Sequence, residues 1–152
     1  SRFLDVGGGK AGTSVSALGM GFGSACSLEL EEYLHSIASK NLSVLGLNDK
    51  IELINKNAFE YKDYARFSHI FIFSIVVGDL HRDLLSHIAD CLCAEKKGEN
   101  VTFYVAIYGE LDFQMLEDGL CNGSQGRAQI DLVKNEICPF RGNNIRVFKL
   151  TF

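Results

Sequence analysis

The chain has no tryptophan, only one proline and no long uninterrupted run of apolar residues. The single proline, Pro139, argues against a proline-rich linker or a low-complexity tail, so we expect one folded domain over residues 1–152. The apolar run at residues 70–78 is much shorter than the roughly 20 residues that a membrane-spanning helix needs. These absences predict a single domain that does not enter a membrane.

Basic charge and cysteine motifs are also scarce. The formal net charge is −4 and the pair Lys96–Lys97 is only a short solvated basic segment, so the sequence carries no strong signal of nucleic-acid binding. The cysteines are odd in number and form no C-x-x-C motif, which predicts neither a metal site nor a disulfide framework; they are Cys26, Cys91, Cys93, Cys121 and Cys138. Reduced cysteines are typical of a cytoplasmic or nuclear protein.

The beginning of the chain carries the clearest functional signal. An apolar strand at residues 2–6 is followed by Gly7, Gly9 and Gly12, the first, third and sixth positions of a six-residue loop, and then by a helix start. Glycines let the backbone turn tightly and approach a ligand, while a helix N-terminus offers unpaired N–H groups. The segment therefore predicts a loop that binds a nucleotide-type cofactor. Because the chain opens directly on this strand, we expect that it has been trimmed at its N-terminus.

Apolar periodicity then alternates between strands and helices. It predicts strands over 2–6, 25–30, 51–54, 68–77 and 101–107, with helices over 13–18, over 31–45 and from Leu80 onward. The run at 68–77 is so continuously apolar that we expect a central strand covered on both faces. The chain then predicts a hairpin from strands at 130–138 and 145–152 around a turn rich in Gly and Asn. The fold class is α/β, a doubly wound, mostly parallel seven-stranded sheet with a C-terminal antiparallel hairpin and a ligand at the carboxyl ends of the early strands.

Two of the predicted helices have clear apolar stripes. The helix over 31–45 ends at Gly46, and the helix that follows residue 79 has Asp79 as its N-cap. The first stripe consists of Tyr33, Leu34, Ile37, Ala38 and Leu45, and the second of Leu80, Leu84, Leu85, Ile88, Ala89 and Leu92.

The glycine spacing alone fits a dinucleotide as well as other cofactors, so the choice depends on further residues. Asp5 lies two residues before the first glycine. There a carboxylate repels a pyrophosphate but attracts a sulfonium that carries an amino-acid tail. The alternative is that Asp5 caps or braces the glycine loop.

Two later positions indicate a ribose and an adenine. Glu29 ends the second strand, where an acid accepts hydrogen bonds from ribose hydroxyls, although it also fits a helix-start acid beside Glu31 and Glu32. Asn57 and Ala58 follow the third strand. The Asn57 oxygen fits an exocyclic amine and the Ala58 N–H fits a ring nitrogen, but Asn is also an ordinary turn residue.

Together these residues resemble the class I S-adenosylmethionine-dependent methyltransferase superfamily, over about residues 2–107 by motif. The chain departs from the superfamily's pattern at Ala11, where many members have a glycine, and at Asn57, where an acid is usual. The resemblance implies S-adenosyl-L-methionine as the cofactor. It implies cofactor contacts from Asp5, Gly7, Gly9, Gly12, Glu29, Asn57, Ala58 and Ser74.

Methyl transfer requires mainly that the acceptor is aligned with the activated carbon and that water is excluded. The polar residues nearest the expected methyl position are Asp79 and His81, which are the candidate catalytic residues. Asp79 also fits a helix N-cap and His81 an exposed helix residue. The segment from Ser74 lacks the Asn/Asp-Pro-Pro-aromatic motif of base and glutamine N-methylators. We therefore expect a protein side chain or a small molecule as the methyl acceptor. The run 70–78 also faintly resembles a segment of the nucleosomal histone-lysine methyltransferases that lack a SET domain. Those enzymes have an asparagine at the position that Ser74 takes in this chain.

Two alternatives stay open. The glycine pattern fits an NAD(P)-binding oxidoreductase domain, which Asp5 disfavours, and the plain segment 74–77 fits an inactive methyltransferase-like binding or scaffold module. Binding of a nicotinamide nucleotide would favour the first alternative. Cofactor binding without turnover over a broad acceptor panel would favour the second. The oligomeric state does not follow from these motifs.

Overall fold

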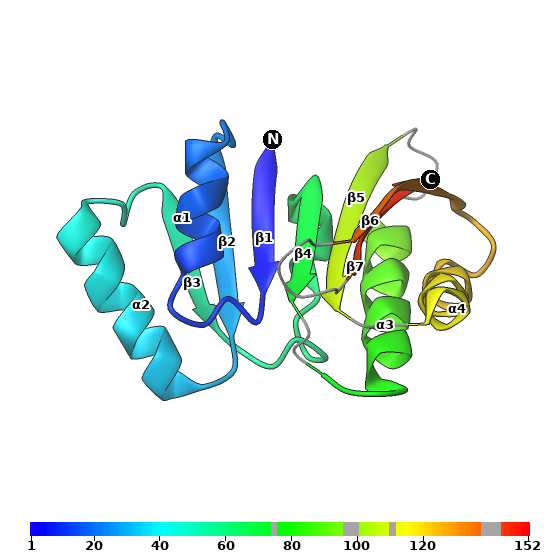
Figure 1. Ribbon diagram of the computed structural model, residues 1–152, viewed down its shortest axis with the longest axis horizontal. Coiled ribbons are helices and arrows are strands. Elements are labelled where there is room, and N and C mark those ends of the chain that lie inside the picture. Colours follow the sequence, from blue (N-terminus) through cyan, green and yellow to red (C-terminus); the bar gives the residue numbers. More distant parts are fainter. Residues whose placement is uncertain (74–75, 96–100, 110–111, 138–143) are drawn as a thin grey trace.

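The computed structural model describes residues 1–73, 76–95, 101–109, 112–137 and 144–152. These residues form one seven-stranded sheet in the order β3-β2-β1-β4-β5-β7-β6 (Figure 1). Its strands are β1 Arg2–Val6, β2 Ser24–Glu29, β3 Ile51–Asn55, β4 His69–Phe73, β5 Thr102–Gly109, β6 Gln129–Ile137 and β7 Asn144–Thr151. The first five pair in parallel, whereas β7 lies antiparallel between β5 and β6. This confirms the predicted α/β class and the antiparallel hairpin.

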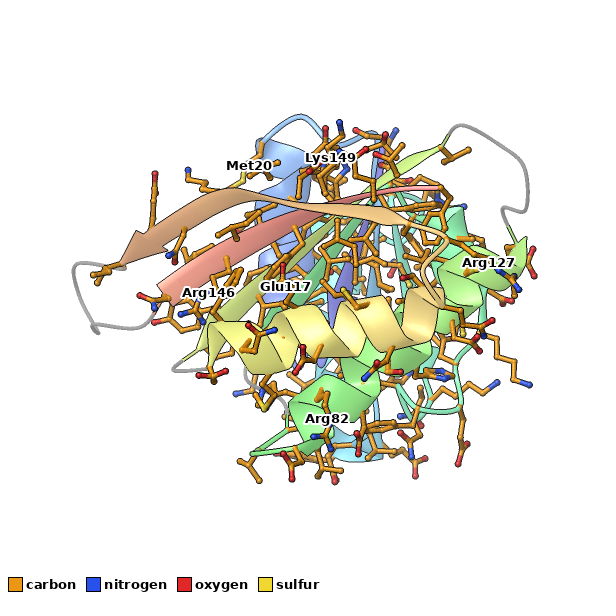
Figure 2. All side chains as sticks on the ribbon, turned by 90° about the vertical axis from the view of Figure 1, so that its right-hand side faces the viewer. Met20, Arg82, Glu117, Arg127, Arg146 and Lys149 are labelled. Atoms are coloured by element: carbon orange, nitrogen blue, oxygen red, sulfur yellow. The ribbon has the colours of Figure 1, made fainter. Side chains whose placement is uncertain are left out.

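Helices cover the two faces of the sheet unequally. On one face, which we call the α1 face, helices α1 (Gly12–Gly19) and α2 (Glu32–Leu45) pack over β1, β2 and β3. On the opposite α3 face lie α3 (Leu80–Glu95), α4 (Phe113–Ser124) and the short 3-10 helix η1 (Asp63–Arg66). Figure 2 shows α3 and α4 beneath β6 and β7, with Met20 and Lys149 on the other side of the sheet.

Helices α3 and α4 approach each other closely because α4 presents glycines to α3. A Cβ at Gly119 would lie 2.7 Å from the carbonyl oxygen of Arg82, and a Cβ at Gly123 would collide with the carbonyl group of Ser86. The apolar periodicity of the sequence predicts neither α4 nor η1. Glycine is a poor helix former, so two glycines in 12 residues weaken the helical pattern of α4.

The strand predicted over 68–77 was too long. β4 ends at Phe73, and Val77 is 78 % exposed. β4 is a central strand as expected, because it lies between β1 and β5. Its burial is uneven, since Ile70 and Ile72 are buried on the α3 face whereas Phe73 on the other face is 46 % exposed. Apolar content alone therefore overestimated both the length of the strand and its burial.

Both apolar stripes included residues that the structure exposes. Tyr33 and Leu45 of α2 are 73 % and 55 % exposed, while Ala38 and Leu42 are buried. These two buried residues are four apart on one helix face, whereas Tyr33 and Leu45 lie in the end turns. Leu80 at the start of α3 is likewise 48 % exposed. Gly46 does end α2, in the left-handed conformation with φ 65°.

The described residues contain neither a helix that could span a membrane nor a cluster of metal ligands. No described helix is both long enough and apolar enough to cross a membrane. In the same parts of the chain, no three His, Cys, Asp or Glu side chains are grouped so that they would hold a metal ion. Cys26, Cys91 and Cys93 are buried and unpaired and Cys121 is exposed, whereas Cys138 lies outside the described residues.

Candidate functional site

A pocket of about 470 Å³ opens at the carboxyl ends of β1, β2 and β3. Parallel strands of an open α/β sheet place their ligands at this edge, because the loops that follow the strands meet there. The pocket is lined by Gly7, Leu28, Glu29, Leu30, Glu31, Lys56, Asn57, Ala58, Phe59 and Val76. It therefore brings together four of the predicted cofactor residues, Gly7, Glu29, Asn57 and Ala58.

Glu29 is the anchor of this pocket. Its carboxylate accepts a hydrogen bond from the Gly9 N–H at 2.8 Å through Oε2 and another from the Glu31 N–H at 2.9 Å through Oε1. The residue is only 8 % exposed. A carboxylate has about four lone-pair positions, so each oxygen keeps one position for a ligand donor. The geometry suits two neighbouring hydroxyl groups.

The glycine loop is tied to β2 by backbone hydrogen bonds. The N–H groups of Gly7 and Gly8 both donate to the Leu28 carbonyl oxygen, at 2.8 Å and 3.1 Å. Gly9 has φ 56° and Ala11 has φ 66°, so both adopt the left-handed region. Alanine at this position supplies no glycine freedom, which makes Ala11 an uncommon residue for its conformation. Ala11 nevertheless occupies the N-cap position of α1 and is fully buried.

Asp5 lies beneath the glycine loop and is not among the residues that line the pocket. It is 1 % exposed and receives a hydrogen bond from the Thr13 side chain. Burial raises the pKa of Asp5 to about 7, the Thr13 hydrogen bond lowers it, and the nearby Glu29 charge raises it further. Its Oδ2 and the hydroxyl of Ser27 find no hydrogen-bond partner among the described residues. This placement fits a brace of the loop better than a direct cofactor contact.

The segment after β3 is a firmly anchored turn. The Asn57 Oδ1 accepts a hydrogen bond from the Phe59 N–H at 3.0 Å, and its second lone pair stays available to a ligand. The Tyr64 hydroxyl donates to the Ala58 carbonyl oxygen at 2.7 Å. Tyr64 is fully buried in the core, so the turn is fixed to η1 from below.

The other predicted site residues lie apart from this pocket or outside the described residues. Gly12, the first residue of α1, borders a separate depression of about 340 Å³ that includes Lys10 and Asn41. Ser74 lies outside the described residues. Gly9 meets the pocket through its hydrogen bond to Glu29.

The candidate catalytic residues lie in and before the first turn of α3. The Asp79 side chain is exposed and forms an ion pair with Arg82 at 3.6 Å, while its carbonyl oxygen accepts from the Asp83 N–H as a helix N-cap does. His81 is buried at 3 % exposure, and this burial lowers its pKa. His81 is thus a neutral ring inside the molecule at pH 7, rather than the exposed helix residue of the alternative interpretation. Its catalytic role stays a prediction.

Sequence reasoning missed two apolar walls of the pocket. Leu30, directly after Glu29, is 59 % exposed, and Phe59 follows Ala58 in the turn. A flat apolar ligand fits between such walls because its faces leave water. The sequence did indicate Leu30, because a large apolar residue directly after the acid that ends a strand lies in a loop, where it does not pack in the core. Lys56 and Val76 also line the pocket, but no sequence pattern identified them as site residues.

No protein-family model and no curated protein matches the chain. Solved structures do. A protein of the NADB-Rossmann superfamily from Streptococcus agalactiae has 21 % identity and a TM-score of 0.72, covering 99 % of this chain and 62 % of its own. A Streptococcus pneumoniae protein assigned as a tRNA methyltransferase has 19 % identity and a TM-score of 0.70, covering 99 % and 63 %. An RNA methyltransferase from Salinibacter ruber, solved with S-adenosyl-L-homocysteine, has 14 % identity and a TM-score of 0.66, covering 99 % and 79 %. The chain thus spans less than two thirds of the length of the first two.

Proposed function

We propose that this chain, which has the Rossmann-like fold of class I S-adenosylmethionine-dependent methyltransferases, binds S-adenosyl-L-methionine and transfers its methyl group. The observation that carries the proposal is the Glu29 carboxylate, held by two backbone N–H groups at the mouth of a pocket of about 470 Å³. Its two remaining acceptor positions match the two hydroxyls of a ribose. An additional phosphate at this carboxylate would be repelled.

The rest of the pocket divides by chemistry. Leu30 and Phe59 provide apolar walls for an adenine, and Asn57 with the Ala58 N–H provides polar groups for its edge. Gly7 and Val76 line the part of the pocket next to β1 and β4, where the amino-acid tail of the cofactor would lie. When bound, the cofactor supplies an already activated methyl carbon. The residues of the chain then have to position the acceptor and exclude water.

For the acceptor, we propose RNA as the first class to test, ahead of a protein side chain or a small molecule. Two of the structural neighbours are named as acting on RNA, one of them on tRNA. The formal net charge of −4 weighs against RNA, because phosphate contacts need Lys and Arg. An acceptor panel of unmodified tRNA, histone and small amines, with methyl transfer from labelled cofactor as the readout, ranks the classes directly.

Calorimetric titration tests cofactor binding. We expect the chain to bind S-adenosyl-L-homocysteine and not NAD or NADP, and we expect Glu29→Ala to abolish that binding. The matched control is Glu136→Gln, because Glu136 is an exposed acid on β6 at the far edge of the sheet. Binding of NAD or NADP instead would contradict the proposal. Binding of S-adenosyl-L-homocysteine without methyl transfer to any acceptor of the panel would favour the alternative of an inactive, methyltransferase-like scaffold.

A further inference from the structure

Phe73 is the last residue of β4 and lies at the edge of the sheet where the strands β1, β4 and β5 end (Figure 1). It pairs with Tyr108 of β5, and the two rings stack with their centroids 4.8 Å apart and their planes 5° from parallel. Neighbouring strands are also about 4.8 Å apart, so rings that stack at this spacing face each other across the sheet. Tyr108 therefore covers one face of the Phe73 ring. Because β4 lies between β5 and β1, the other face, which we call the free face of Phe73, is turned toward β1.

β1 supplies no side chain that would cover the free face of Phe73. Val6 is the last residue of β1 that pairs with β4, so the next residue, Gly7, lies level with Phe73. Further back along the same two strands, the ring of Phe3 in β1 stacks against the ring of Phe71 at 6.3 Å. Gly7 cannot do the same for Phe73, which leaves 46 % of its surface exposed. The free face is thus open because the glycine loop begins beside it.

The neighbours of Phe73 hold its ring in place. Tyr108 is only 8 % exposed, and the ring of Phe71 lies 6.5 Å from the Phe73 ring on the same face of the sheet. A flat ligand that stacks on an exposed aromatic ring removes the apolar surfaces of both from water. Because the ring is already held before a ligand arrives, little side-chain entropy is lost on binding. A fixed ring with one open face therefore suits a flat ligand.

We propose that the free face of Phe73 binds an unpaired base of the acceptor RNA and places it beside the cofactor. This inference rests on the proposed function, in which S-adenosyl-L-methionine fills the pocket and RNA is the methyl acceptor. Gly7, level with Phe73, lines that pocket, so a base stacked on Phe73 lies next to the bound cofactor. A base within a duplex has both faces covered by its neighbours, so only an unpaired or flipped-out base can stack here.

The charge of the chain favours recognition of a base over recognition of phosphates. Asp and Glu outnumber Lys and Arg, 19 to 15. At the carboxyl edge of the sheet, Arg82 already forms ion pairs with Asp79 at 3.6 Å and with Asp83 at 3.4 Å. Base stacking needs no charge, and one stacked base changes affinity roughly 10- to 100-fold. RNA bound in this way should depend only weakly on salt, because few phosphates are contacted.

Fluorescence anisotropy with two labelled RNAs tests the inference. One probe is a single strand of about 12 nucleotides that cannot pair with itself, and the other is an abasic strand of the same length. The chain is saturated with S-adenosyl-L-homocysteine, which keeps the bases out of the cofactor pocket. We expect the strand with bases to bind roughly 10-fold or more tightly than the abasic strand. Its log affinity plotted against log salt concentration should have a slope shallower than about −1.4, the value for two phosphate contacts.

Substitutions of Phe73 show whether its ring makes the difference. Phe73→Leu keeps an apolar side chain without a ring and should abolish the preference for the strand with bases, whereas Phe73→Trp keeps a stacking face and should retain it. The matched control is Tyr33→Leu, because Tyr33 is an aromatic residue of α2 that is 73 % exposed and does not line the cofactor pocket. Calorimetric titration with S-adenosyl-L-homocysteine should give the same affinity for these variants as for the unmodified chain, which shows that they fold.

The possible outcomes separate this inference from the proposed function. If S-adenosyl-L-homocysteine binds but the two RNA strands bind equally, or not at all, the inference is wrong and the cofactor proposal stands. A steeper salt slope shared by both strands shows that the chain binds phosphates and overturns the inference as well. Equal losses in Phe73→Leu and Tyr33→Leu also contradict it. If S-adenosyl-L-homocysteine itself does not bind, the proposed function is wrong and the inference falls with it.

Discussion

The two halves of the sheet are held in different ways. In the half formed by β1, β2 and β3, helices lie on the α1 face. Hydrogen bonds accepted by Glu29 and Asn57 and donated by Tyr64 shape a pocket at the strand ends. In the half formed by β4 to β7, the close contact of α3 and α4 shapes one face, and the other face is open. The first half places polar groups for a ligand, and the second supplies packing. Substitutions in the two halves should therefore separate ligand binding from stability.

The largest expected effect is on the packing half. Gly123→Ala adds a Cβ that collides with the carbonyl group of Ser86, so α4 must move away from α3. We expect the free energy of unfolding to fall by about 3 kcal/mol, the upper end of usual overpacking costs. The affinity of the folded protein for S-adenosyl-L-homocysteine should not change. Gly19→Ala is the control, since the space around Gly19 is open. Urea unfolding and calorimetry measure the two quantities, and a parallel loss of affinity would contradict the separation.

The buried carboxyl group of Asp5 should make the stability of the fold depend on pH. Its folded pKa of about 7 lies above its unfolded value, so the stability that it contributes is present at low pH and is lost as the pH rises through 7. Between about pH 5 and pH 7.5, the stability of the unmodified chain should fall by roughly 2 kcal/mol relative to Asp5→Asn. Urea unfolding of both proteins at these pH values gives the difference. A difference that does not vary with pH would show that Asp5 titrates normally.

In the pocket half, Gly8→Ala tests the fit of the glycine loop. The added Cβ would collide with the Ser27 hydroxyl and lie 3.1 Å from Oδ2 of Asp5. We expect a loss of about 2 kcal/mol in stability together with weaker S-adenosyl-L-homocysteine binding, because the loop must lift from β2. Ser27→Ala in the same chain should restore part of both. Gly12→Ala, where the space is open, should change neither. Equal effects at the two glycines would contradict this account of the loop.

The smallest expected effect concerns the turn after β3. Tyr64→Phe removes the hydroxyl that donates to the Ala58 carbonyl oxygen, at a cost of about 1 kcal/mol in stability. Loosening of this turn should also weaken S-adenosyl-L-homocysteine binding several-fold. Tyr33→Phe, at a side chain that is 73 % exposed, is the control and should change neither quantity. Calorimetric titration of both variants with S-adenosyl-L-homocysteine measures the change in affinity. Unchanged binding in Tyr64→Phe would mean that the turn does not need this hydrogen bond.

The difference between the halves also explains which features were predictable from the sequence. Glu29 and Asn57 were accessible to sequence reasoning because they lie at or just after the ends of predicted strands, where the loops of a parallel sheet gather ligand-binding groups. The sheet and its closing hairpin follow from apolar periodicity. The contact of α3 with α4 does not, because Gly119 and Gly123 look like helix breakers until the neighbouring backbone is seen. The burial of His81 and Asp5 depends on long-range packing and was equally hidden.

The central claim is that Glu29 holds the ribose of the cofactor. The most direct measurement compares the affinities of the unmodified chain and Glu29→Gln for S-adenosyl-L-homocysteine and for its 2′-deoxyribose analogue. The account predicts that the unmodified chain prefers the ribose form by roughly 10-fold or more, as a hydrogen bond to a charged group allows, and that Glu29→Gln loses this preference. An equal preference in both proteins, or none in either, would contradict the claim.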